Sequence, residues 1–171
     1  MRRRSSLVVA TLFGVALLLG PSALDPRPRF VWNASESLPI GLYAVHPIRD
    51  WYVTELVVVR PQAQLASFLA AGGYLPVGLP MLKRILALPG QTVCRRELLI
   101  IVDGVEVGAA RSNDHRGRPL PDWQGCRAVG DEQIFLMNWQ SDSSLDGRYF
   151  GLTAMSDVIG RAAPLWTREP S

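Results

Sequence analysis

The sequence is poor in residues on which many enzymes rely for catalysis. It contains only two histidines and two cysteines in 171 residues. His46 precedes a proline and His115 lies in a polar stretch, and neither belongs to a metal-binding spacing such as His-Glu-x-x-His. A glycine-rich phosphate-binding loop is also missing. We therefore expect no metal and no cofactor, and a histidine-dependent triad has no local motif to support it.

The folded part of the chain also lacks an excess of charge of either sign. The net charge is +3, from 18 Lys+Arg against 15 Asp+Glu, and Arg2–Arg4 supply the whole excess. Arg111, Arg116 and Arg118 lie close together, but Asp114 and Asp122 interrupt the cluster, which is typical of a solvated loop rather than a basic surface. We therefore predict no nucleic-acid partner, because such binding needs a basic cluster or stripe.

The N-terminal segment is the clearest feature of the composition. No residue from Ser5 to Leu24 is charged, and this stretch of 20 residues follows Arg2–Arg4. A helix of that length crosses about 30 Å of hydrocarbon, and preceding arginines hold the N-terminus in the cytoplasm. We predict a cytoplasmic basic tip and transmembrane anchor over residues 1–24, with an exported domain over 25–171. The lipid bilayer is then a partner of the chain.

A cleavable secretory signal is the alternative interpretation of this segment. A short apolar core fits such a signal, but Pro21 lies among the small residues where cleavage would occur, and the Ala-x-Ala pattern is missing. We favour a retained anchor, and both interpretations export the domain.

Export bears on Cys94 and Cys126, the only two cysteines. In an oxidising compartment such a pair indicates a disulfide. The bridge would close a loop of about 30 residues and stabilise the fold by roughly 3 kcal/mol in the chain-entropy model. Two unpaired thiols are the alternative, because spacing alone does not show that the side chains meet.

Short apolar runs separated by turn residues dominate the rest of the chain. Asp103-Gly104 is typical of a type I′ hairpin turn, and residues 111–125 have the composition of a long surface loop. We expect a mainly β domain with one or two short helices, in addition to the transmembrane helix. The expected helix covers residues 62–71, and the expected strands cover 41–45, 56–60, 81–88, 98–102, 105–107, 133–137 and 158–163.

Three segments carry residues that could perform chemistry. In the first, Asn33–Tyr43, a serine precedes x-Pro-x-Gly in a turn-rich stretch. In the second, Lys83–Gly90, a lysine lies within an apolar run, and the third, Asn138–Gly151, concentrates polar side chains where a strand should end. A serine hydroxyl is a weak nucleophile until a base takes its proton. Desolvation can lower the pKa of a lysine by up to 3–5 units from about 10.4, so a buried lysine could be that base.

Each segment taken singly has a structural explanation. Ser-x-Pro is usually a turn, and a lone lysine in an apolar run usually extends its amine to solvent. Asp146 and Arg148 would ordinarily form an ion pair that only stabilises the fold. Their order along one chain, behind a predicted membrane anchor, favours a catalytic role for the three segments together.

The order of these motifs resembles the bacterial type I signal peptidases. The first reads Ser-x-Pro-x-Gly-Leu-Tyr, the second Lys-Arg-x-x-Ala-x-Pro-Gly and the third Ser-x-Asp-x-Arg-Tyr-Phe-Gly. The form of the first motif and the small size point to the TraF branch, the conjugative transfer signal peptidases. The resemblance covers most of the chain and implies a signal-peptidase-like β domain lying against the membrane surface.

The resemblance also implies roles for individual residues. Ser37 is the implied nucleophile and Lys83 the implied general base of a Ser-Lys dyad. Ser144 matches the serine that orients the lysine amine. The remaining matches are supporting ones: Ser35 adds an oxyanion donor beside the main-chain N–H of Ser37, and Asp146 and Arg148 form a bracing pair.

The sequence departs from the family pattern at three places. Gln91 stands where the family often has aspartate after Pro-Gly, and Gly147 replaces a usual serine. Residues 136–138, Leu-Met-Asn, replace the usual Gly-Asp-Asn lead of the third motif. These departures bear on the supporting residues more than on Ser37 and Lys83.

The resemblance implies a substrate and a location. The substrate is an exported precursor with small residues before the cut, in particular a conjugative propilin, and other conjugation components are further partners. The location is the bacterial inner membrane, with a single pass, the N-terminus inside and the catalytic domain in the periplasm. Hydrolysis and cyclisation of the product both remain open. So do two other functions: a housekeeping signal peptidase, and a non-enzymatic anchored β module for assembly.

Overall fold

The computed structural model describes residues 9, 11–15 and 28–168. Between residues 28 and 168 the chain forms eleven strands, two short α-helices and one 3-10 turn. The strands are β1 (Phe30–Asn33), β2 (Ile40–His46), β3 (Leu56–Val59), β4 (Met81–Ala87), β5 (Thr92–Arg96), β6 (Leu99–Val102), β7 (Val105–Ala109), β8 (Gly125–Ala128), β9 (Gln133–Leu136), β10 (Leu152–Ala154) and β11 (Val158–Arg168). The helices are α2 (Ala63–Ala71) and α3 (Gly147–Phe150), and the 3-10 turn is η1 (Met155–Asp157). The expectation of a mainly β domain with one or two short helices is confirmed.

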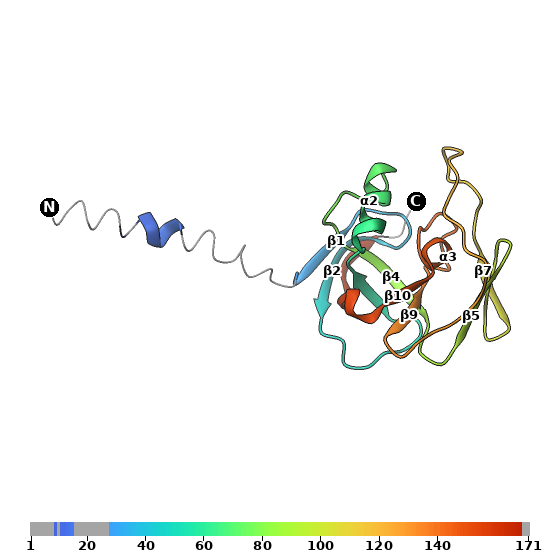
Figure 1. The fold of residues 1–171 in the computed structure, drawn as a ribbon. Coiled ribbons are helices and arrows are strands. Elements are labelled where there is room, and N and C mark those ends of the chain that lie inside the picture. Colours follow the sequence, from blue (N-terminus) through green and yellow to red (C-terminus); the bar gives the residue numbers. More distant parts are fainter. Residues whose placement is uncertain (1–8, 10, 16–27, 169–171) are drawn as a thin grey trace.

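The strands form two antiparallel sheets. The larger has seven strands in the order β1-β2-β11-β3-β4-β9-β10, and the smaller has four in the order β7-β6-β5-β8. In Figure 1 the smaller sheet, with β5 and β7, lies on the side of the domain opposite β1 and β2. Strand β11 pairs with β2 on one side and with β3 on the other, so it joins the two parts of the larger sheet.

Strand β3 is buried on both of its faces. All four of its residues are buried; Leu56 and Val58 pack into one apolar cluster and Val57 and Val59 into another. Side chains alternate between the faces of a strand, so an uninterrupted apolar run is what a strand with two covered faces requires. The neighbouring strand β4 divides its side chains in the same way, with Leu82 in the first cluster and Ile85 in the second.

The predicted hairpin and the predicted cysteine pair both lie in the smaller sheet. Asp103 and Gly104 have positive φ angles of 48° and 85°, as a type I′ turn requires, and they join β6 to β7. Cys94 of β5 lies opposite Cys126 of β8 in the strand register, and the two form a disulfide.

The predicted helix and each predicted strand have a counterpart in the structure, and four strands were not predicted. The missed strands β1, β5, β8 and β10 are short and carry little apolar periodicity; β8, for example, is exposed at all four residues. Strand β11 continues to Arg168, beyond the predicted end at residue 163. It passes Pro164 at a register shift, where a ladder hydrogen bond is not needed.

The predicted transmembrane anchor falls mainly on residues outside the described part of the chain. Of that segment, residues 9 and 11–15 are described and are helical. In the described ranges, no helix is long and apolar enough to cross a membrane.

Replacing Cys94 and Cys126 together by alanine should lower the free energy of unfolding by about 3–4 kcal/mol, because the unfolded chain loses a constraint. The two cysteines are 32 residues apart in sequence, which sets the size of the closed loop. Urea unfolding of the oxidised native chain and of the double variant measures the difference. The native chain unfolded with a reducing agent is the control and should match the variant. Equal midpoints for the oxidised native chain and the variant would contradict the prediction.

Candidate active site

The Ser37 turn is residues 34–39, between β1 and β2, and the side chain of Asn33 organises it. The Asn33 amide nitrogen donates to the carbonyls of Ser35, Leu38 and Pro39, at 2.9, 3.1 and 3.1 Å. Its amide oxygen accepts from the main-chain N–H and the hydroxyl of Ser35, both at 3.2 Å. Asn33 is buried, so one side chain satisfies backbone groups that the turn leaves without strand partners.

Two further contacts fix the ends of the Ser37 turn. Leu38 is buried in the same apolar cluster as Leu82 of β4. The Tyr43 hydroxyl donates to the Pro39 carbonyl at 2.6 Å. The Ser37 turn is therefore held against β4, and the Ser37 side chain is half-buried.

The Ser37 hydroxyl has two neighbours. Its oxygen lies 2.9 Å from the Ser35 hydroxyl oxygen, and it accepts a long hydrogen bond of 3.4 Å from the Asn138 amide nitrogen. Ser35 and Ser37 are thus brought together, as the resemblance implied for the nucleophile and its accessory oxyanion donor.

Lys83 is a buried lysine on β4. The residue is 6% exposed, and its amine donates to the Ser144 hydroxyl at 2.8 Å. Desolvation lowers the pKa of Lys83 to about 8; Asp146 acts to raise the pKa and Arg148 to lower it. The neutral amine is therefore much more accessible near neutral pH than that of an ordinary lysine. The predictions of a buried amine, a lowered pKa and contact with Ser144 agree with this geometry.

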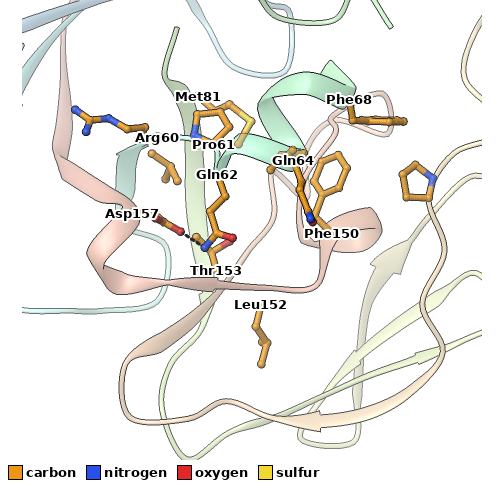
Figure 2. A pocket seen from close by; sticks show the side chains of 13 residues that line it. Arg60, Pro61, Gln62, Gln64, Phe68, Met81, Phe150, Leu152, Thr153 and Asp157 are labelled. Carbon is orange, nitrogen blue, oxygen red and sulfur yellow. Dashed lines mark hydrogen bonds between the residues drawn. The ribbon is translucent and has the colours of Figure 1, made fainter. Parts of the chain in front are cut away.

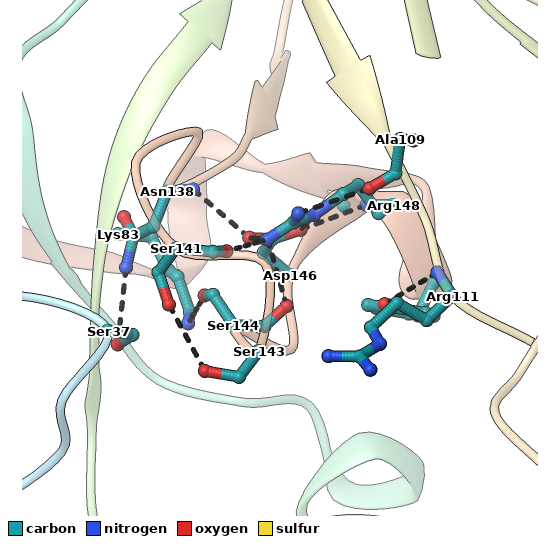
Figure 3. A network of polar contacts seen from close by, with 12 residues as sticks. Ser37, Lys83, Ala109, Arg111, Asn138, Ser141, Ser143, Ser144, Asp146 and Arg148 are labelled. Atoms are coloured by element: carbon teal, nitrogen blue, oxygen red, sulfur yellow. Dashed lines mark hydrogen bonds and ion pairs between the residues drawn. The ribbon is translucent and has the colours of Figure 1, made fainter. Parts of the chain in front are cut away.

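The two residues of the implied dyad, Lys83 and Ser37, are not joined by a hydrogen bond. Within residues 28–168, the Lys83 amine forms a hydrogen bond with Ser144 and none with Ser37. Figure 3 shows the arrangement, with the Asn138 amide pointing to Ser37 and Ser144 beside the Lys83 amine. In enzymes without bound substrate, catalytic hydrogen bonds are often long or poorly aligned and shorten when substrate binds.

Asp146 and Arg148 form a buried ion pair behind Lys83. The Arg148 guanidinium donates to both carboxylate oxygens of Asp146, at 2.9 and 3.0 Å, and both residues are almost fully buried. The same guanidinium donates to the carbonyls of Ser141 and Ser144, at 2.7 and 3.1 Å. Asp146 also caps α3 by accepting from the Arg148 N–H. The pair therefore holds the loop that presents the Ser144 hydroxyl to Lys83 (Figure 3).

Asn138 links the three segments of the site, a role that the sequence did not suggest. Its amide oxygen accepts from the Arg84 N–H at 3.0 Å, and its amide nitrogen donates to the Leu82 carbonyl at 3.2 Å, on either side of Lys83. Its main-chain N–H donates to Asp146 at 3.0 Å. One residue thus contacts the Ser37 turn, β4 and the bracing pair.

Two of the three departures from the family pattern have local structural reasons. A side chain at Gly147 would place its Cβ 2.6 Å from the Leu136 carbonyl oxygen and 2.6 Å from the Phe135 ring, so this backbone accepts only glycine. Gln91 accepts from the Leu88 N–H at 2.9 Å and donates to Asp103 at 2.8 Å. It therefore ties the turn after β4 to the β6–β7 hairpin and lies outside the catalytic contacts.

A cavity of about 370 Å³ lies between α2 and the segment from Phe150 to Asp157. Figure 2 shows its lining, including the Gln62 amide that donates to Asp157 at 2.8 Å. Met81 of β4 is the lining residue nearest to Lys83 in sequence, and neither Ser37 nor Lys83 lines the cavity.

The two histidines are exposed and lie outside the site's hydrogen-bond network. His46 ends β2 and His115 lies in the long loop between β7 and β8. Among the described residues, no group of three or more His, Cys, Asp or Glu side chains could hold a metal ion.

Comparisons with known proteins give matches over nearly the whole chain. The family model described as signal peptidase, peptidase S26, matches residues 2–166. A plasmid transfer protein TraF from Escherichia coli is 31% identical over 96% of this chain and 97% of its own length. A conjugal transfer protein TraF from Agrobacterium fabrum is 32% identical over 97% of this chain and 99% of its own length.

The chain therefore belongs to the signal peptidase family S26, and within it to the TraF-type members. The resemblance inferred from the three motifs is confirmed. Among solved structures, a signal peptidase I from Enterococcus faecalis V583 matches with a TM-score of 0.40 and 19% identity, covering 67% of this chain and 97% of that one.

Replacing Arg148 by alanine should lower the free energy of unfolding by about 3–5 kcal/mol, because the buried Asp146 carboxylate loses its partner. Urea unfolding followed by circular dichroism measures the loss. Arg116→Ala is the matched control, since Arg116 is exposed and only its main-chain N–H forms a hydrogen bond, to Asp114. Equal stability of the two variants would contradict the assignment of Asp146 and Arg148 as a brace.

Proposed function

We propose that the chain is a membrane-bound serine endopeptidase that uses Ser37 as nucleophile and Lys83 as general base. The observation that carries this proposal is the buried Lys83 amine, with its lowered pKa and its hydrogen bond to Ser144. An ammonium with the ordinary pKa of about 10.4 would be a useless base at neutral pH. Membership of the peptidase S26 family supports the same activity.

In the first chemical step, the neutral Lys83 amine takes the hydroxyl proton of Ser37. The Ser37 oxygen then forms a bond to the carbonyl carbon of the scissile peptide. The main-chain N–H of Ser37 and the Ser35 hydroxyl donate to the oxyanion that develops. Ser35 already lies 2.9 Å from the Ser37 oxygen, so its donor is near the reacting atom.

In the second step, the Lys83 ammonium returns its proton to the leaving amine as the peptide bond breaks. The acyl group remains on Ser37. Attack by water releases a linear product, and attack by the amino group of the same acyl chain releases a cyclic one. Ser144 keeps the Lys83 amine oriented through both proton transfers, since its hydroxyl accepts from the amine.

The substrate we propose is an exported precursor of a conjugation system, a propilin cut after small residues. The TraF relatives named as plasmid and conjugal transfer proteins support this choice of system. Other components of the same system are then the partners of the chain.

We further propose a single-pass location in the inner membrane, with the domain of residues 25–171 in the periplasm. An exposed apolar patch, formed by Phe30 and Trp32 of β1 and Leu165 and Trp166 of β11, supports this placement. The rings of Trp32 and Trp166 stack with centroids 5.8 Å apart, on either side of Leu42 in the sheet register. Tryptophan is enriched at the membrane–water interface, and the patch begins just after the predicted anchor.

Ser37→Ala and Lys83→Ala should each abolish cleavage while the protein still folds, because one removes the nucleophile and the other the base. Ser35→Ala should retain activity reduced by ~10²-fold, because it removes one of two oxyanion donors. The assay co-expresses each variant with a candidate propilin and measures product masses, which also separates linear from cyclic products.

Ser143→Ala is the matched control for these serine variants, since Ser143 is exposed and hydrogen-bonds only to Ser141. Full activity of Ser37→Ala or Lys83→Ala would contradict the proposed Ser37–Lys83 dyad. Loss of activity in Ser35→Ala with retention in Ser37→Ala would identify the other serine as nucleophile. Broad cleavage of unrelated preproteins would indicate a housekeeping enzyme, and no cleavage by the native chain would favour an assembly module.

The rate of cleavage should rise with pH along a limb centred near pH 8. The neutral amine accepts the serine proton, so activity is low below the lowered pKa of Lys83 and levels off above it. Measuring kcat from pH 6 to pH 10 tests this. A double variant His46→Ala and His115→Ala should keep the limb. Its disappearance in that variant would name a histidine as the base.

A further inference from the structure

The side chain of Asn138 joins the two halves of the proposed dyad. It is 1% exposed and sits where β9 has ended, so its carboxamide continues the contacts with the edge of β4. It bonds to the Leu82 carbonyl, the Arg84 N–H and the Ser37 hydroxyl, at 3.2, 3.0 and 3.4 Å. Across residues 28–168, no other side chain hydrogen-bonds both to Ser37 and to the backbone of β4.

The backbone of β4 determines which way this carboxamide points. The Leu82 carbonyl can only accept a hydrogen bond, and the Arg84 N–H can only donate one. The amide nitrogen must therefore face Leu82 and the amide oxygen must face Arg84, which removes the usual ambiguity between the two atoms. The second N–H of the same amide then faces the Ser37 oxygen.

This orientation has a consequence for the Ser37 proton. An amide nitrogen donates and does not accept, so Ser37 receives a hydrogen bond from Asn138 and cannot give one back. Its own proton is left for Ser35 or for the neutral Lys83 amine. The contact with Ser35 can run in either direction, since both groups are hydroxyls.

We propose that Asn138 is a positioning residue that directs the Ser37 hydroxyl proton away from itself and toward the general base. The Asn138 carboxamide is bonded to the backbone of the two residues that flank Lys83. The same side chain therefore fixes the nucleophile relative to the strand that carries the base. During attack the Ser37 proton passes to the Lys83 amine and the Ser37 oxygen bonds to the substrate carbonyl carbon. Asn138 neither gains nor loses a proton. This inference rests on the proposed function.

Asn138→Asp tests the direction of the hydrogen bond. The aspartate has the same shape, but its carboxylate accepts the Ser37 proton and repels the Leu82 carbonyl. We expect kcat to fall by ~10²-fold, as misplacement of a reacting group does, with KM within about twofold of the native value.

The same variant should move the activating limb to higher pH. Lys83 is already faced by Asp146, which favours the ammonium, and by Arg148, which opposes it. A second carboxylate beside Lys83 favours the charged amine further, by about one pH unit or more. Asn138→Ala removes the donor without adding charge, so kcat should fall by ~10-fold with the limb unmoved.

The assay uses the full chain in detergent micelles and a quenched fluorogenic peptide with alanine one and three residues before the cut. Gln140→Glu and Gln140→Ala are the matched controls, because Gln140 is an exposed amide two residues further along the same segment. Both should keep the native kcat and the native limb. Thermal unfolding of each variant reports how much of the chain is folded.

Native kcat in both Asn138 variants, with Ser37→Ala inactive, would overturn this inference alone. So would a fall in kcat that only matches the loss of folded protein and leaves the limb of Asn138→Asp in place. Cleavage by Ser37→Ala, or none by the native chain, would instead overturn the proposed function, and the role of Asn138 with it.

Discussion

The site depends on keeping one lysine amine out of water without giving it a carboxylate partner. Desolvation of Lys83 favours the neutral amine, and the buried Asp146 carboxylate nearby opposes that effect. The Arg148 guanidinium donates to both carboxylate oxygens of Asp146. The same carboxylate accepts from the Arg148 N–H, as the cap of α3, and from the Asn138 N–H, so its hydrogen bonds are made to groups other than Lys83. The Lys83 amine is left with a neutral hydroxyl, that of Ser144, as its hydrogen-bond partner. A buried ion pair is weak evidence for stability in general, and here its position explains why it is needed.

Much of the fold could be predicted because the core strands have clear patterns. Strand β3 reads as an apolar run because both faces are covered, and Asp103-Gly104 fits the one turn type that its two positive φ angles require. The missed strands lack such signals. Strand β8 is exposed throughout and is held by pairing with β5 and by Cys126, so its existence depends on a distant segment.

The residues of the candidate site also fall into those that the sequence could predict and those that it could not. Ser37, Lys83 and Ser144 could be proposed because their motifs follow one another in the order found in signal peptidases, although each motif taken singly has a structural explanation. Asn33 and Asn138 were assigned no role, since asparagine is common in turns and at strand ends, although Asn138 stands at the asparagine of the usual Gly-Asp-Asn lead. Their importance lies in backbone groups that only the folded chain brings within reach, such as the Leu82 carbonyl and the Arg84 N–H. The hydrogen bond of Lys83 to Ser144, with none to Ser37, is likewise a detail that a motif does not encode.

The place of β11 in the larger sheet also affects the order in which the strands can pair during folding. This strand comes last among the strands of the chain, yet it lies between β2, which follows the serine turn, and β3, which borders the lysine strand. Such pairing between distant segments forms slowly, because the long intervening chain must be ordered first. Until β11 has been made, the part of the larger sheet that follows the Ser37 turn therefore has no strand pairing to the part that carries Lys83. The proposed pair of Ser37 and Lys83 would therefore be assembled only after the last strand has been added to the sheet.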